Sequence, residues 1–140
     1  MKVFVDANIL VSVVKKEHPL FGYTARIISL AGAGKTRIYT TPVCLAIAFY
    51  FAGKKYSSAA AKEKIRILSQ HLDIAATNAG SVRSAFADPS VNDFEDGLQY
   101  YSALEAGCQC IVTEDKNDYY FSKIQVLSAQ EFYETHMARQ

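Results

Sequence analysis

Short apolar segments that alternate with longer amphipathic ones limit the folds open to this sequence more than any other feature. The first of them, 2–5, is apolar and rich in β-branched residues, and a segment of helical periodicity follows it directly. By the same reasoning we expect strands at 2–5, 37–40, 73–76, 110–113 and 124–127. We expect helices at 7–16, 21–31, 42–52, 57–72, 81–87, 93–106 and 128–136, the last of them opened by a capping box of Ser128 and Glu131.

Alternating strands and helices are typical of an α/β domain with a central, mostly parallel sheet. Right-handed crossovers then place helices on both faces and bring the carboxyl ends of the strands to one edge, where such sheets bind ligands. The chain has 140 residues, half of them hydrophobic, which gives room for one domain spanning 1–140.

Charge and cysteine content narrow the functional classes. The formal net charge is +1, so bulk charge predicts no particular partner. Its distribution is uneven: 18–72 contains eight Lys and Arg against one acid, and 73–140 contains eleven acids against four basic residues. Three cysteines without metal-ligand spacing predict buried free thiols in a reducing compartment. With no signal-peptide pattern and no apolar run long enough to cross a bilayer, we expect a cytoplasmic protein without a membrane span.

The apolar opening VFVDANIL carries one carboxylate, Asp6, and one amide, Asn8, where the first expected strand ends. An ionised carboxylate is costly to bury without a cation or hydrogen-bond donors, so some such group must contact Asp6. One interpretation is an N-cap for the following helix, and the other is a cation ligand. Both can hold, because a capping carboxylate keeps an oxygen for a cation.

Acidic residues also begin the sixth expected helix. A helical wheel predicts a core-facing stripe made of Phe94, Leu98, Tyr101 and Leu104. Asp93 and Asp96 lie on the flank of this stripe, and Glu95 points away from them. Two like charges at i and i+3 repel each other unless a cation or a capping arrangement separates them. The pattern therefore fits either a helix cap with a dipole contact or a shared cation.

A third acidic group follows the fourth expected strand, where Thr113 is followed by Asp115 and Asp118. Turn formation is the simpler interpretation of this group alone. Three acidic groups at one sheet edge favour a hard cation, because carboxylate oxygens suit Mg²⁺ and Mn²⁺. We therefore expect Asp6, Asp96 and Asp115 to bind a divalent metal.

Taken together, the stretches FVDANIL, DFEDGLQYYSALEAG and IVTEDKNDYY resemble the PIN-domain family, which includes the VapC-type toxins of bacterial toxin–antitoxin pairs. The resemblance covers essentially the whole chain. It implies a three-layer α/β/α fold, cleavage of RNA with Mg²⁺ or Mn²⁺, an antitoxin protein as partner and a homodimer. The family's acidic positions fall on Asp6, Asp96, Asp115 and Asp118, and its supporting positions on Asn8, Asp93, Thr113 and Tyr119.

One position of the family pattern lacks its usual residue. Members usually carry a glutamate on the helix after the second strand, at a position that aligns with Ile47 or an immediate neighbour. Between Glu17 and Glu63 this chain has no carboxylate. Fewer acids weaken metal binding, so the alternative to an active nuclease is a weakened or inactive PIN domain that binds RNA or a protein.

Basic and aromatic residues of the first half are the candidates for RNA contact. The residues expected to hold the RNA backbone are Lys35, Arg37, Lys54 and Lys55, with a solvated helix face as the alternative interpretation. The residues expected mainly in the core, with base stacking as the alternative for one of them, are Phe49, Tyr50, Phe51 and Tyr56.

Two other functional classes fit poorly. The stretch AGAGKT resembles the end of a phosphate-binding loop, but Ser29 stands where that loop needs its first glycine, and a helix precedes it instead of a strand. An aspartyl-phosphate domain of the receiver type needs an aspartate in the middle of the chain, and the stretch between Glu17 and Glu63 contains none. A phosphatase of this class needs a second aspartate two residues after the first, where this chain has Asn8.

Overall fold

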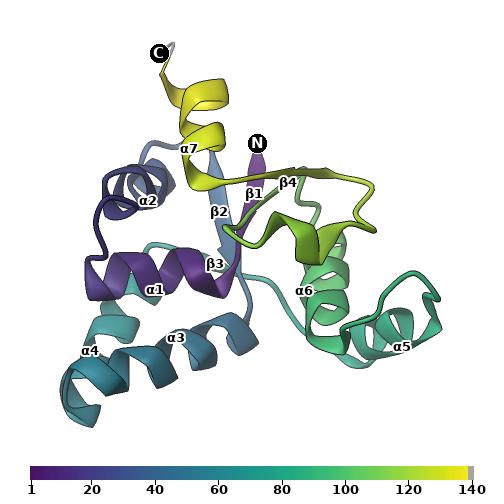
Figure 1. Cartoon of the computed structure of the whole chain (residues 1–140), viewed down its shortest axis with the longest axis horizontal. Coiled ribbons are helices and arrows are strands. Elements are labelled where there is room, and N and C mark those ends of the chain that lie inside the picture. The colour runs from purple at the N-terminus through teal and green to yellow at the C-terminus, as the bar shows by residue number, and fades with distance from the viewer. Residues whose placement is uncertain (139–140) are drawn as a thin grey trace.

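Five parallel strands lie side by side in the order β3-β2-β1-β4-β5 in the computed structural model, which describes residues 1–138 (Figure 1). The strands are β1 (Lys2–Val5), β2 (Arg37–Thr40), β3 (Asp73–Ile74), β4 (Cys110–Val112) and β5 (Gln125–Leu127). The central strand β1 pairs with β2 and β4, and Val5 lies opposite Val112. The predicted parallel α/β sheet is confirmed, with three strands slightly shorter than expected.

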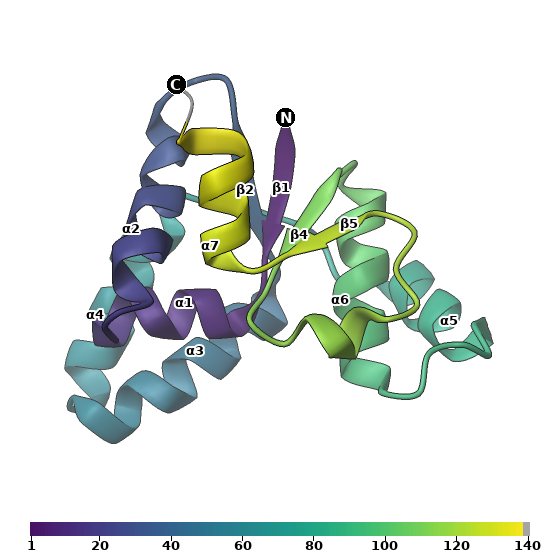
Figure 2. The ribbon, with the colours of Figure 1, turned by 45° about the horizontal axis from the view of Figure 1, so that its top comes forward.

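Helices cover both faces of this sheet. They are α1 (Ala7–Lys15), α2 (Phe21–Ser29), α3 (Pro42–Lys55), α4 (Ser58–Ser69), α5 (Ala79–Ala87), α6 (Phe94–Glu105) and α7 (Ala129–Phe132), with short 3₁₀ turns at Leu30–Gly32 and Lys116–Tyr119 and a π turn at Tyr133–Met137. Helices α1 to α4 lie on one side of the strands, and α5 and α6 lie on the other (Figures 1 and 2). The predicted three-layer arrangement is thus confirmed.

Helix ends follow the local sequence signals in part: α5 begins at Ala79 where residue 81 is predicted, and α7 changes to the π turn after Phe132 where 136 is predicted. The capping box of Ser128 and Glu131 forms as predicted and opens α7. The predicted end of the third helix at residue 52, before Gly53, is wrong, because α3 continues to Lys55. Gly53 has no positive φ, so its backbone is compatible with a continuing helix. Lys54 and Lys55 in the last turn then stabilise the helix by their interaction with the negative end of its dipole.

Helix α3 buries less of its surface than expected. Its fully buried residues are Cys44, Ala48 and Ala52, which recur every four residues and form one narrow stripe of small side chains. Tyr50 and Phe51 are 60% and 38% exposed, so the expectation that both lie in the core is wrong. The small stripe lets α3 pack closely on α1, which leaves the larger aromatic side chains on the outer face.

The core lies around the central strands. Val3, Phe4 and Val5 of β1 and Ile111 and Val112 of β4 are all fully buried, as strands covered on both faces must be. The cysteines are buried free thiols, as predicted. Among residues 1–138, no helix is long and apolar enough to cross a membrane.

Candidate active site

Asp6 and Thr113 meet because they follow two paired strands. The register that sets Val5 beside Val112 ends with a hydrogen bond from the Asp6 amide to the Val112 carbonyl oxygen, 3.0 Å long. The next side chains along each strand are therefore neighbours at the carboxyl edge of the sheet. The Thr113 hydroxyl donates to Oδ2 of Asp6 at 3.0 Å.

Hydrogen-bond donors surround the Asp6 carboxylate. The Ala7 amide donates to Oδ1 at 2.8 Å, which confirms the N-cap interpretation. The hydroxyl of the buried Tyr119 donates to Oδ2 at 3.1 Å. Burial raises the pKa of Asp6 above its ordinary value, and these hydrogen bonds oppose that change without cancelling it.

Cys44 of α3 is a neighbour of Asp6 that the sequence patterns do not reveal. Its Sγ atom lies 3.8 Å from Oδ1 of Asp6. Burial, followed by the negative charge of Asp6, raises the pKa of the Cys44 thiol to about 12, so the sulfur keeps its proton. A neutral thiol in this position can donate weakly to the carboxylate.

Asn8 links helix α1 to the segment after β4. Its Nδ2 atom donates to Oγ1 of Thr113 at 3.0 Å and to Oδ2 of Asp115 at 3.2 Å. In the other direction, the Glu114 amide donates to Oδ1 of Asn8 at 3.1 Å. The amide side chain therefore fixes the Asp115 carboxylate relative to the first strand, in the supporting position that the resemblance implies.

Helix α6 contributes the acids from the other side of the sheet edge. Asp93 is its N-cap, and Oδ1 of Asp93 accepts the amides of Glu95 at 2.9 Å and Asp96 at 3.3 Å. Partial burial and the nearby carboxylates of Asp93, Asp118, Asp6 and Glu95 raise the pKa of Asp96 to about 7. Negative charge is therefore concentrated around Asp96.

The predicted core-facing stripe of α6 is confirmed for Tyr101 and Leu104, which pack against the core, and is wrong for Phe94. Phe94 is 39% exposed, and the buried residues include Gln99, Tyr100 and Ala103. The Gln99 side-chain oxygen accepts the Thr41 hydroxyl at 2.5 Å, and the Tyr100 hydroxyl accepts the Lys123 amide at 3.0 Å. These bonds pair the Gln99 oxygen and the Tyr100 hydroxyl, while Nε2 of Gln99 is buried without a hydrogen-bond partner in the described part of the chain, and apolar periodicity does not indicate this buried face.

Glu95 is a candidate site residue that the sequence reasoning missed. The helical wheel directs it away from Asp96, whereas the structure places both on the wall of the same cavity. Partial burial raises the pKa of Glu95, and the charges of Asp93, Asp6 and Asp118 raise it further. Its place in the first turn, next to the sheet edge, decides this contact more than its angle around the helix axis.

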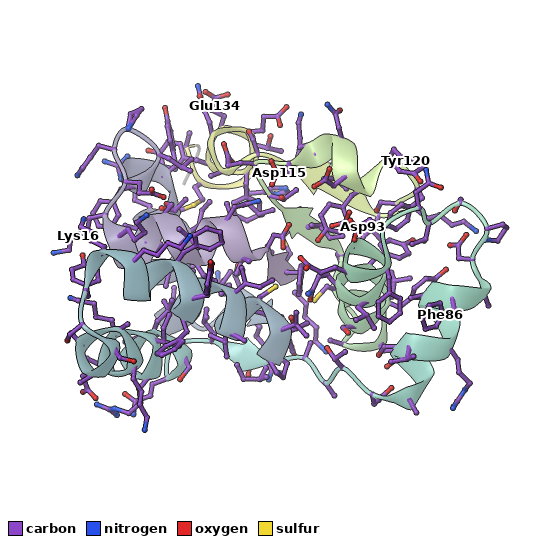
Figure 3. The ribbon with its side chains drawn as sticks, turned by 60° about the horizontal axis from the view of Figure 1, so that its bottom comes forward. Lys16, Phe86, Asp93, Asp115, Tyr120 and Glu134 are labelled. Atoms are coloured by element: carbon purple, nitrogen blue, oxygen red, sulfur yellow. The ribbon has the colours of Figure 1, made fainter. Side chains whose placement is uncertain are left out.

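A cavity of about 510 Å³ joins these acids. The acidic residues on its wall are Asp6, Glu17, Glu95, Asp96, Glu114, Asp115 and Asp118, the basic residue is Lys15, and the apolar residues are Ala7, Val11, Leu20, Ile47 and Phe51. The side-chain view labels Asp93 at the start of α6 and Asp115 after β4, which mark two of the surrounding elements (Figure 3). The acids predicted from three separate motifs thus line one cavity.

The carboxylates suit a hard cation in chemistry, although their positions do not form a complete site. Within residues 1–138, no group of three or more His, Cys, Asp or Glu side chains is arranged to hold a metal ion. The Asp96 and Asp118 carboxylates accept no hydrogen bond from the described part of the chain, so their oxygens are open to a ligand. Shared ligation of one ion by Asp6, Asp96 and Asp115 stays a prediction.

The predicted basic residues divide into two groups. Lys35 and Arg37 lie at the amino end of β2, away from the carboxyl edge that holds the acids, and Arg37 binds Asp73 through two hydrogen bonds of 2.9 and 3.1 Å. Lys54 and Lys55 lie in the last turn of α3, close in sequence to the cavity residue Phe51. Lys55 donates to the backbone oxygen of Lys15, which lies on the cavity wall, at 2.6 Å, so this residue is linked to the cavity.

The fold and this acidic edge define a PIN domain. Residues 2–117 match the PIN domain family model, and the chain belongs to that family. The chain is 30% identical to Ribonuclease VapC1 of Aquifex aeolicus (strain VF5) over 140 residues, which cover 95% of this chain and 94% of that protein.

Solved structures share the fold at low sequence identity. The chain resembles VapBC2 from Rickettsia felis, solved bound to a DNA fragment from its promoter, with a TM-score of 0.68 and 20% identity over 90% of this chain and 97% of that one. It also resembles VapC20 of Mycobacterium tuberculosis, described as a toxin that cleaves the sarcin-ricin loop, with a TM-score of 0.65 and 17% identity over 88% and 98% of the two chains.

Proposed function

We propose that this protein is a divalent-metal-dependent endoribonuclease of the PIN type. The observation that carries the proposal is the convergence of carboxylates from β1, α6 and the segment after β4 on one cavity at the carboxyl edge of the sheet. Membership of the PIN domain family and the relationship to a ribonuclease support it.

The residues that would hold Mg²⁺ or Mn²⁺ are Asp6, Asp96 and Asp115, with Glu95 and Asp118 as further acids on the same wall. A metal bound there would polarise the scissile phosphate and lower the pKa of a bound water, and both effects assist phosphodiester hydrolysis. The chain's own contribution is orientation: Thr113 and Tyr119 fix Asp6, and Asn8 fixes Asp115. Apolar side chains of α1 and α3, among them Val11, Ile47 and Phe51, form another part of the cavity wall.

The direct test is cleavage of labelled single-stranded RNAs by the wild type and the Asp6→Asn and Asp96→Asn variants, in Mn²⁺, in Mg²⁺ and in EDTA. We expect metal-dependent cleavage that each variant lowers by about 100-fold or more, because the lost charge stabilisation amounts to several kcal/mol. Glu134→Gln is the matched control, since Glu134 is an exposed acid near the C-terminus and outside the cavity. Cleavage that persists in both aspartate variants would reject the proposal.

The second candidate is a PIN domain that binds RNA or a protein without cutting. Ile47 favours it, because an apolar side chain lines the cavity at the position where the family resemblance implies a glutamate. This candidate predicts RNA or protein binding with no cleavage above the variants in either metal. The same RNA panel, read by both binding and cleavage, therefore separates the two functions.

The proposed biological setting is the toxin of a toxin–antitoxin pair that acts in the cytoplasm. Support comes from relatives named as ribonuclease VapC1 and as VapBC2 bound to promoter DNA. The partners proposed are RNA, an antitoxin protein and a second copy of the chain. Co-purification with the product of a neighbouring gene tests the antitoxin, and sedimentation of the isolated protein tests the homodimer.

A further inference from the structure

Two aromatic side chains of α3 stand outside the core beside the acidic cavity. Tyr50 is 60% exposed and Phe51 is 38% exposed, and their rings contact edge to face with centroids 5.3 Å apart. Phe51 also lines the cavity, so the exposed pair continues directly into its wall. The fold does not account for this exposure, because α3 packs through its stripe of small residues instead.

A cation accompanies the aromatic pair. The Nζ atom of Lys54 lies 4.6 Å from the centroid of the Tyr50 ring and 5.5 Å from that of Phe51. Lys54 forms no ion pair with any residue of 1–138, so its charge remains available to an anionic ligand. The only acid between residues 18 and 72, Glu63, is bound by Arg66 at 2.5 Å.

Together these features favour an unpaired nucleic-acid strand over a protein partner. Every nucleobase has a face that stacks on an aromatic ring, and its neighbouring phosphate requires a cation, which matches a ring pair beside an unpaired lysine. A duplex keeps its bases stacked on each other, so it cannot use such a surface. An apolar protein helix would gain little from the lysine that lies over both rings.

We propose that Tyr50, Phe51 and Lys54 form a base-stacking subsite, in which one unpaired base of a single-stranded RNA stacks on Tyr50 and Lys54 contacts an adjacent phosphate. Because Phe51 borders the cavity, a base held there places a nearby phosphodiester of the same strand at the acids. The inference rests on the proposed ribonuclease function and adds to it the part of the substrate that is recognised. It makes the unpaired bases beside the scissile bond a determinant of where the RNA is cut.

The test measures binding of a short, fluorescently labelled oligoribonucleotide by anisotropy in EDTA, where metal-dependent cleavage does not occur. We expect Tyr50→Ala to raise Kd by about fivefold or more, and Tyr50→Phe, which keeps the ring, to bind within about twofold of the wild type. Phe86→Ala is the matched control, because Phe86 is 71% exposed on α5, at the other end of the molecule from α3 (Figures 1 and 3), and should bind as the wild type does.

A series of oligonucleotides, each with one abasic nucleotide, identifies the stacked base. We expect one position at which removal of the base weakens binding to the wild type but not to Tyr50→Ala. An abasic penalty that persists in Tyr50→Ala would overturn the subsite. Equal losses in Tyr50→Ala and Phe86→Ala would also overturn it, as would unaltered RNA binding by Tyr50→Ala, which would leave the surface to a protein partner.

The outcome is separable from that of the ribonuclease proposal. A wild type that binds RNA through Tyr50 but never cleaves it in Mn²⁺ or Mg²⁺ retains the subsite and rejects the nuclease. A Tyr50→Ala variant with wild-type binding and wild-type KM for cleavage rejects the subsite and retains the nuclease.

Discussion

Thr113 uses all its hydrogen-bonding capacity to hold the site together. Its hydroxyl donates to Asp6 and accepts from the Asn8 side chain and from the Asp115 amide, at 3.0 to 3.1 Å. A hydroxyl has one donor and two acceptor sites, so no capacity remains. The residue is fully buried, and its three hydrogen bonds join the residue after β1, helix α1 and the segment after β4.

Replacing Thr113 with Val keeps the shape of the side chain and removes these three hydrogen bonds. We expect the free energy of unfolding to fall by about 1–3 kcal/mol, because three partly buried polar groups lose a hydrogen bond. Urea denaturation measures the change. Thr113→Ser is the control that keeps the hydroxyl, and a loss as large in Ser as in Val would assign the effect to the methyl group instead.

Ile47 is an apolar residue on the wall of the cavity that the acidic residues line. We expect Ile47→Glu to tighten Mn²⁺ binding by about tenfold or more, since affinity at carboxylate sites rises with the number of charged ligands. Titration calorimetry with Mn²⁺ measures this change, and Ile47→Gln has a similar size without the charge. If Gln tightened binding as much as Glu, the charge at this position would not be the cause.

At the level of elements, α5 and α6 approach each other closely through a glycine. A Cβ atom at Gly97 would lie 2.7 Å from Cγ1 of Val91 and 3.1 Å from Cβ of Ala85. The residue is buried within α6, so an added methyl group would have to displace Val91, in the segment between the two helices, and Ala85 of α5. Gly53, in α3, has open space around it and is exposed.

Substitution by alanine should therefore change the free energy of unfolding in opposite directions at Gly97 and Gly53. We expect Gly97→Ala to lower the free energy of unfolding by about 1–3 kcal/mol through overpacking. We expect Gly53→Ala to raise it by about 0.5–1 kcal/mol, because alanine loses less backbone entropy in a helix. Thermal or urea unfolding of both variants checks the pair, and a stabilising Gly97→Ala would show that α5 moves aside freely.

At the scale of the whole molecule, the cavity concentrates negative charge from both sides of the sheet edge. The pKa of Asp96 lies near 7 in the folded protein against an ordinary value of 3.8, and the pKa values of Asp6 and Glu95 are also raised. A carboxyl group with a raised pKa favours the folded state when protonated and opposes it when ionised. Its contribution to stability is thus complete below its ordinary pKa and is lost as the pH rises through the folded value.

We therefore expect the metal-free protein to lose stability, relative to Asp96→Asn, as the pH rises from about 4 to 8. Melting temperatures of both proteins in EDTA across this range measure the difference. Saturating Mn²⁺ should restore stability to the wild type above pH 7, because a cation bound to the folded state offsets the repulsion. A difference between the two proteins that does not vary with pH would contradict this account.

The sequence by itself determined the layered α/β architecture, the order of its elements and the residues at the ends of its strands. These features depend on local periodicity, capping and the parallel register, in which Asp6 and Thr113 necessarily become neighbours. The acids of separate motifs were predicted to share one edge for the same reason, and they line one cavity.

Only the tertiary structure decided which faces of the helices are buried. The buried face of α6 includes Gln99 and Tyr100, whose side-chain oxygens bond to Thr41 and Lys123, both distant in sequence. Glu95 reached the cavity, and Tyr50 and Phe51 of α3 remained outside the core, for the same kind of reason. Burial of a helix face depends on the partners that other elements bring to it, and apolar periodicity along one segment contains no information about those partners.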